Sequence, residues 1–302
     1  MKGILSKKKA IVALCLSALL LSAVLSGCAP RGDTIVIGAK DFTEQFILGY
    51  VAQILIAETT GMNTRLVSNL PTWILFQALR SGEVDLYIEY TGTVVGNIFG
   101  DTTPRPPDET FEIARAGLLE RYEILMLDRL GFNNTYTLAV RPDTAAQFNL
   151  RTISDLALVA HQLTLGGTME FVNREDGLLG LRRVYDGITF GTELTINGAL
   201  RYVALMNDEI QVTDAFSTDG MLLRHELVVL EDNLDFFPAY HAAVIIRQDS
   251  AERFPELVET MNRLIGLLDD DAMRRLNYLV DAEQQAPQLV ARNFLREAGL
   301  IQ

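Results

Sequence analysis

The sequence predicts an α/β fold built as two lobes of similar plan. Strand-type and helix-type segments alternate from residue 34 onward, and the first three strands with the helices between them form a βαβαβ unit, which implies a parallel sheet. Residues 84–90 form a short strand that ends in an aromatic residue with threonine close behind, and residues 210–216 repeat this arrangement. The repeat indicates a second α/β lobe.

The individual elements follow from hydrophobic periodicity, since strands alternate or run apolar and helices repeat apolar residues every three to four positions. We expect strands at 34–38, 65–67, 84–90, 135–140, 162–165, 187–190, 210–216 and 242–246. We expect one helix that ends at Gly61, helices at 73–80, 108–129 and 199–206, and helical structure over most of 250–302. Two further helices should start near residues 154 and 169. Asp41 or Thr43 is the expected N-cap of the first helix, because its side-chain oxygen can accept from a free backbone amide.

Residues 1–27 have the pattern of a secretory signal peptide. Lysines precede the uncharged apolar run 10–25, which is too short to span a bilayer. Leu25-Ser26-Gly27-Cys28 resembles a bacterial lipobox, in which the cysteine is diacylated and becomes the new N-terminus. Residues 28–32 would then be a tether that anchors an extracytoplasmic protein to the cell membrane, because two acyl chains bind stably. The alternative is an ordinary secretory peptide cleaved near Gly27, with Cys28 an unmodified thiol.

The composition of the remaining chain excludes several classes of function. Cleavage before Cys28 leaves 275 of the 302 residues, enough for one large or two moderate domains, and removes four lysines, which changes the formal net charge from −13 to −17. Such a charge argues against nucleic-acid binding, which depends on basic residues. Because Cys15 and Cys28 are the only cysteines, the folded part has no disulfide, thiol nucleophile or cysteine metal site.

No catalytic or cofactor motif is present in the sequence. The three histidines are far apart and none has a metal-ligand spacing, so we expect no metal. Gly166-Gly167-Thr168 could bind an anion at a helix start, but a tight turn is the better explanation of the two glycines. We therefore expect no cofactor and no enzymatic activity.

Aromatic residues recur instead at strand ends and connections: Tyr90, Tyr136, Phe216 and Tyr240. Each ring alone is explained as a core residue. At equivalent points of two lobes, however, the four rings would line one cleft, which suits a quaternary ammonium ion because aromatic faces attract cations that cannot form hydrogen bonds. Each such contact contributes on the order of 0.5 to 2 kcal/mol when desolvated.

Several longer motifs, in order along nearly the whole mature chain, resemble the osmoprotectant substrate-binding proteins of ABC importers, which bind glycine betaine, choline and carnitine. The motifs are Lys40-Asp41-Phe42-Thr43-Glu44-Gln45, Glu89-Tyr90-Thr91-Gly92-Thr93, Gly131-Phe132-Asn133-Asn134-Thr135-Tyr136, Arg174-Glu175-Asp176-Gly177, Asp214-Ala215-Phe216-Ser217-Thr218-Asp219-Gly220 and Phe236-Phe237-Pro238-Ala239-Tyr240. The resemblance implies a two-lobed periplasmic-binding (type II-like) fold with a hinge and an interlobe ligand cleft. Lobe I would comprise 33–136 with 238–302, and lobe II 137–237.

The resemblance also implies the ligand contacts. It assigns the aromatic cage to Tyr90, Tyr136, Phe216 and Tyr240, and contacts with a ligand carboxylate to Thr93 and Gln45. Phe216 departs from the family pattern, where tyrosine is usual, so one hydroxyl is missing. Because Thr93 stands where narrower choline binders carry aspartate, and because the cage contains no carboxylate, we expect betaine-type zwitterions to be preferred over choline.

The implied partners are a small quaternary ammonium ligand and the membrane subunits of an ABC permease, with the chain itself a monomer. Two alternatives stay open at this point. The same fold could bind another compatible solute or a polar amino acid, which Phe216 leaves possible. The chain could also be an exported sensory or enzymatic domain on a two-lobed scaffold.

Overall fold

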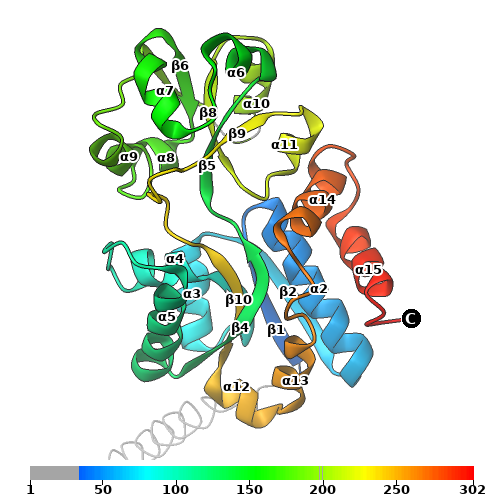
Figure 1. Ribbon diagram of the computed structural model, residues 1–302. Helices are drawn as coiled ribbons and strands as arrows, with labels where there is room; N and C mark the ends of the chain where they lie inside the picture. Colours follow the sequence, from blue (N-terminus) through cyan, green and yellow to red (C-terminus); the bar gives the residue numbers. More distant parts are fainter. Residues whose placement is uncertain (1–33, 197, 199) are drawn as a thin grey trace, which may run out of the picture. The chain divides into compact units, whose positions relative to one another are not determined.

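Two five-stranded sheets, each covered by helices, organise the chain in the computed structural model (Figure 1), which describes residues 34–196, 198 and 200–302. Residues 35–302 form one compact unit. Helices and strands are numbered as in Figure 1. The expected signal peptide, Cys28 and the tether 28–32 lie outside the described residues.

The first sheet has the strand order β2-β1-β3-β10-β4. Its strands are β1 (Thr34–Lys40), β2 (Asn63–Leu70), β3 (Leu86–Tyr90), β4 (Ile124–Asn133) and β10 (His241–Arg247). Its helical elements are α2 (Thr43–Thr60), α3 (Thr72–Ser81), α4 (Thr91–Thr93), the π-helical turn η1 (Val94–Ile98), α5 (Pro107–Tyr122), α12 (Gln248–Arg253), α13 (Glu256–Asn262), α14 (Asp270–Asp281) and α15 (Pro287–Glu297). As expected for the βαβαβ unit, β1 and β3 are parallel, whereas β10 runs antiparallel to β3 and β4.

Both faces of the first sheet are apolar, because alternate residues of each strand point to opposite sides. On β10, Ala242, Val244 and Ile246 join a core with α2, α13, α14 and α15. Ala243 and Ile245 join the core on the other face, with α3, η1 and α5. The sheet is therefore buried between two helical layers, as Figure 1 shows.

The second sheet has the order β7-β6-β8-β5-β9. Its strands are β5 (Tyr136–Val140), β6 (Thr164–Gly167), β7 (Thr192–Thr195), β8 (Val212–Phe216) and β9 (Val228–Leu230). Its helical elements are α6 (Pro142–Phe148), α7 (Ile153–Val159), the 3₁₀ turn η2 (Ala160–Gln162), α8 (Met169–Asn173), α9 (Leu178–Val184), α10 (Leu200–Met206) and α11 (Gly220–Arg224). The chain leaves the first sheet between β4 and β5 and returns to it between β9 and β10.

Three expectations about local structure are wrong. The segment 108–129 is not one helix. Helix α5 ends at Tyr122, its C-cap Glu123 has a left-handed φ of 56°, and β4 begins at Ile124. Residues 187–190 are not a strand, and the strand of this region is β7 at Thr192–Thr195. The N-cap of α2 is Phe42, without a side-chain hydrogen bond, and Thr43 Oγ1 instead donates to Asp281 Oδ1 at 2.6 Å.

Among the described residues, no helix has both the length and the hydropathy needed to cross a membrane.

Candidate ligand-binding site

Tyr90 lies at the carboxyl end of β3 and is almost fully buried. Its hydroxyl donates a hydrogen bond to Glu44 Oε1 at 2.6 Å and accepts one from Gln45 Nε2 at 3.1 Å. The Lys40 ammonium lies 4.9 Å from the centroid of the ring, and the Phe42 ring stacks at 6.3 Å between centroids. Burial and the nearby Glu44 charge raise the pKa of the Tyr90 hydroxyl well above its usual value, so the hydroxyl keeps its proton and donates.

The side chain of Gln45 is buried and its amide is occupied by other parts of the protein. Its Oε1 accepts from the Lys40 amide at 3.3 Å, and its Nε2 donates to the Ile88 carbonyl at 3.0 Å as well as to Tyr90. These bonds join α2 to β1 and β3. Gln45 therefore orients the Tyr90 hydroxyl.

A buried ion pair lies beside Tyr90. The Lys40 ammonium bonds to Glu89 Oε1, and side-chain exposures of 5% and 0% place the pair in the protein interior. Glu89 also accepts from the Tyr87 hydroxyl at 3.1 Å and from the Tyr90 amide at 2.8 Å. The Lys40 ammonium therefore balances the charge of the Glu89 carboxylate, and the other two donors satisfy its oxygens. A buried charge is stable only with such partners.

Tyr136 and Phe216 form a stacked pair in the second sheet. They are opposite residues of the antiparallel strands β5 and β8, and their ring centroids are 4.8 Å apart with an angle of 28° between planes. The rings of Phe171 and Phe237 lie 5.4 Å and 6.1 Å from the centroid of Tyr136. Tyr136 is thus part of an aromatic cluster that also contains residues not singled out as individual site candidates in the sequence.

Tyr240 stands just before β10 and meets the Arg174–Gly177 motif of the second sheet. Its hydroxyl donates to Asp176 Oδ2, and Arg174 Nη2 donates to the same hydroxyl at 3.4 Å. Arg174 also forms two hydrogen bonds with Asp176, and its guanidinium lies 5.8 Å from the centroid of Tyr136. Burial and the Asp176 charge raise the pKa of the Tyr240 hydroxyl well above its usual value.

The expectation of a cage without a carboxylate is therefore wrong. Asp176 bonds to the Tyr240 hydroxyl and Glu44 to the Tyr90 hydroxyl. Both carboxylates reach these rings from distant parts of the chain, so the residues next to each tyrosine in sequence do not reveal them. Asp176 carries its charge next to Arg174, whereas Glu44 is surrounded by neutral donors.

The turn that follows Tyr90 is fixed against the segment before β10. Thr91 Oγ1 donates to the Ala239 carbonyl at 3.0 Å and accepts from the His241 amide at 3.2 Å. A Cβ at Gly92 would lie 2.8 Å from the Ala239 oxygen and from Cε1 of the Tyr240 ring, so only glycine allows this approach. Thr93 is buried, and we find no hydrogen bond of its hydroxyl within the part of the chain that the structure describes.

The structure brings some of the predicted site residues together and leaves others apart. Tyr136 contacts Phe216 directly, and Tyr240 reaches Tyr136 through Arg174. Over the described ranges, the ring of Tyr90 stacks with Phe42 and with none of the other three proposed cage rings. Its link to the second sheet runs through Glu44, which bonds to Thr218, two residues after Phe216.

Within residues 34–196, 198 and 200–302, no group of three or more histidine, cysteine, aspartate or glutamate side chains could hold a metal ion.

Comparison with known proteins identifies the family. A family model described as the substrate-binding domain of the ABC-type glycine betaine transport system matches residues 33–297. The chain belongs to this family. It is accordingly the extracytoplasmic substrate-binding component of an ABC importer, a binding protein and not an enzyme.

Relatives and solved structures agree with this assignment. The carnitine transport binding protein OpuCC of Listeria monocytogenes is 35% identical over 96% of this chain and 97% of its own. The glycine-betaine-binding protein of Pseudomonas aeruginosa is 34% identical over 90% of each chain. A crystal structure of a glycine betaine/carnitine/choline ABC transporter matches with a TM-score of 0.80 and 31% identity over 88% of this chain and 99% of the other. The predicted two-lobed α/β fold is confirmed.

Proposed function

We propose that this binding protein captures quaternary ammonium osmolytes such as glycine betaine, carnitine and choline at Tyr90, Tyr136, Phe216 and Tyr240, and delivers them to its permease. The observation that carries the proposal is the arrangement around Tyr136, whose ring packs on Phe216 and already attracts one cation, Arg174, at 5.8 Å. Buried rings with cations near them are suited to cation–π binding. The names of the relatives, which refer to carnitine and glycine betaine, support this ligand class.

Competition binding tests the ligand class. Radiolabelled glycine betaine should bind saturably and be displaced by excess unlabelled carnitine or choline. A polar amino acid should not displace it. If a polar amino acid bound and the three ammonium compounds did not, the alternative ligand class would replace this one.

Within this class we propose a preference for betaine-type zwitterions over choline, because the Thr93 hydroxyl is available to donate to a ligand carboxylate. Replacing Thr93 by alanine should therefore weaken glycine betaine binding several-fold more than choline binding, since choline has no carboxylate. Calorimetry with both ligands measures the difference. Equal losses for the two ligands would show that the hydroxyl does not contact the carboxylate. For Gln45, the hydrogen bond to the Tyr90 hydroxyl favours an orienting role, because its other amide hydrogen already bonds to the Ile88 carbonyl.

We propose lobe boundaries at the two connections between the sheets. Lobe I comprises 33–136 with 238–302 and carries β1, β2, β3, β4 and β10. Lobe II comprises 137–237 and carries the second sheet except for Tyr136, the first residue of β5. Tyr136 and Tyr240 then stand at the crossings. Ligand would shift the equilibrium toward the closed form by its greater affinity for that form.

We also propose that the protein is a monomer anchored by a diacylated Cys28. Replacing Cys28 by alanine should move the protein from the membrane fraction to the soluble fraction, because the acyl chains supply the membrane affinity. Fractionation and immunoblotting of cells that express either form measure this change. Mass spectrometry that found an unmodified Cys28 thiol in the mature protein would contradict the anchor.

A further inference from the structure

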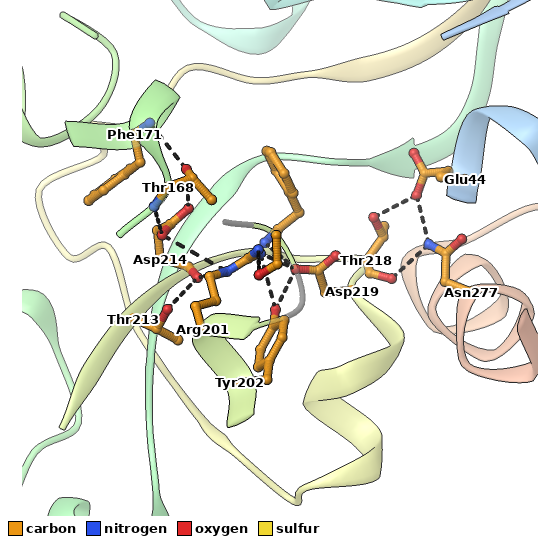
Figure 2. Close-up of polar contacts among 12 residues, drawn as sticks. Glu44, Thr168, Phe171, Arg201, Tyr202, Thr213, Asp214, Thr218, Asp219 and Asn277 are labelled. Atoms are coloured by element: carbon orange, nitrogen blue, oxygen red, sulfur yellow. Dashed lines mark hydrogen bonds and ion pairs between the residues drawn. The ribbon is translucent and has the colours of Figure 1, made fainter. Parts of the chain in front are cut away.

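The carboxylate of Glu44, in the first turn of α2, collects hydrogen bonds from four separate elements while its residue is only 2% exposed. Its Oε1 accepts from the Tyr90 hydroxyl at 2.6 Å and from Asn134 Nδ2 at 2.8 Å. Its Oε2 accepts from Thr218 Oγ1 at 2.6 Å and from Asn277 Nδ2 at 3.0 Å. Figure 2 shows the side chains of Thr218 and Asn277 directed at this carboxylate.

These four donors come from both sheets. Tyr90 ends β3 of the first sheet, and Asn277 lies in α14, which packs on the first sheet. Asn134 lies in the connection between β4 and β5, and Thr218 follows β8 of the second sheet. Glu44 is therefore a single group that joins a proposed cage ring of one sheet to the turn after Phe216 in the other.

The turn that carries Thr218 is held firmly on both sides. Toward the first sheet, Asn277 Nδ2 also donates to the Thr218 carbonyl at 2.9 Å, and a Cβ at Gly220 would lie 2.4 Å from the Tyr278 nitrogen, so the backbones are in close contact. Toward the second sheet, Asp219 Oδ2 accepts from Arg201 Nη2 at 2.9 Å (Figure 2). It also accepts from the Phe216 amide at 3.1 Å. Thr218 is thus linked to the backbone of Phe216 through its neighbour Asp219.

The chemistry of the four donors matches a carboxylate and no other side chain. All four are neutral groups that offer a hydrogen, so two oxygen atoms with four lone pairs satisfy them together. An amide at this position would turn a nitrogen with its own hydrogens toward two of the donors. Burial raises the pKa of Glu44, and the hydrogen bonds from Thr218, Tyr90, Asn277 and Asn134 oppose that rise.

We propose that Glu44 is a positioning residue that couples the Tyr90 ring to the β8–α11 turn, and so holds rings of the two sheets in the arrangement that binds ligand. The inference rests on the proposed quaternary ammonium site, to which it adds a residue that acts through Tyr90 and Thr218. A ligand that contacts Tyr90 on one sheet and Phe216 on the other benefits from this link, because the bridge favours the arrangement in which both rings can contact it.

The test uses calorimetric titration of glycine betaine into the mature protein and four variants. Thr218→Val keeps the shape of the side chain but loses the hydrogen bond, whereas Thr218→Ser keeps the hydroxyl. Glu44→Gln replaces one of the two acceptor oxygens by an NH2 group. Glu58→Gln, on the same helix in a partly exposed pair with Arg292, is the matched control. We expect Thr218→Val and Glu44→Gln to weaken binding at least tenfold, and Thr218→Ser and Glu58→Gln to stay within twofold of the wild type.

A double-mutant cycle separates coupling from a general loss of structure. Tyr90→Phe removes only the hydroxyl, so the double variant with Thr218→Val should lose several-fold less affinity than the product of the two single losses. Losses that multiply, or wild-type affinity in Thr218→Val, would overturn the role of Glu44 even if Glu44→Gln fails to fold. Absence of binding by the folded wild-type protein would instead overturn the proposed function together with this inference.

Discussion

Replacing Tyr90 by alanine is expected to weaken glycine betaine binding at least tenfold. A desolvated cation–π contact is worth up to about 2 kcal/mol, and about 1.4 kcal/mol corresponds to a tenfold change in affinity. The substitution also removes the hydroxyl that donates to Glu44 and leaves that buried carboxylate with one donor fewer. Both losses act in the same direction. Equilibrium titration of the two proteins measures the change.

Tyr122 provides the control for this substitution. It lies at the end of α5 and packs edge-on against Phe76, with 5.2 Å between ring centroids, and it belongs to no proposed ligand contact. Tyr122→Ala should lower stability and leave the affinity for glycine betaine unchanged. A Tyr90→Ala protein that bound glycine betaine as tightly as the wild type would remove Tyr90 from the site.

The second large effect concerns stability. Replacing Lys40 by methionine should lower the free energy of unfolding by about 3 to 5 kcal/mol, because it leaves the Glu89 carboxylate buried and uncompensated in charge. Denaturant titration followed by circular dichroism measures the loss. A loss below about 1 kcal/mol, the size expected for an exposed pair, would contradict the account.

Two further variants check the cause of that loss. Lys40→Met combined with Glu89→Gln should recover most of the stability, because the buried charge is gone and both hydrogen bonds can be kept. The amide oxygen can accept from the Tyr90 amide, and the amide nitrogen can donate to the Tyr87 hydroxyl. Arg115→Met breaks the exposed pair with Asp128, whose side chains are 50% and 62% exposed, and should cost at most about 1 kcal/mol.

The fold could be predicted where the signal is local. The alternation of elements, the βαβαβ unit and the similar strands β3 and β8 all follow from short-range periodicity. The helix predicted at 123–129 is wrong for a clear reason. Residues 124–127 are an apolar run that fits a helix or a strand equally well. They form a strand because they pair with β10, which is distant in the sequence. The edge strand β7 is fully exposed and has no apolar face to reveal it.

In the site, too, residues marked by their local sequence could be predicted, whereas contacts between distant segments could not. The four aromatic positions stand at strand ends and in recognisable motifs, so the sequence indicates them. Their polar partners come from remote segments: Asp176 bonds to Tyr240, and Glu44 bonds to Tyr90. Glu44 lies within a quoted motif, where it fits equally well as an ordinary acid in the first turn of a helix. Only the folded structure reveals its four donors.

The most direct measurement is a calorimetric titration of protein that lacks residues 1–28 with glycine betaine, then choline, carnitine and proline betaine. The account predicts saturable binding of at least one of these compounds at micromolar concentration, which corresponds to about −8 kcal/mol. It also predicts tighter binding of the betaines than of choline. Absence of binding by all four compounds, in folded protein freed of ligand, would contradict the proposed site and leave only the family and the fold.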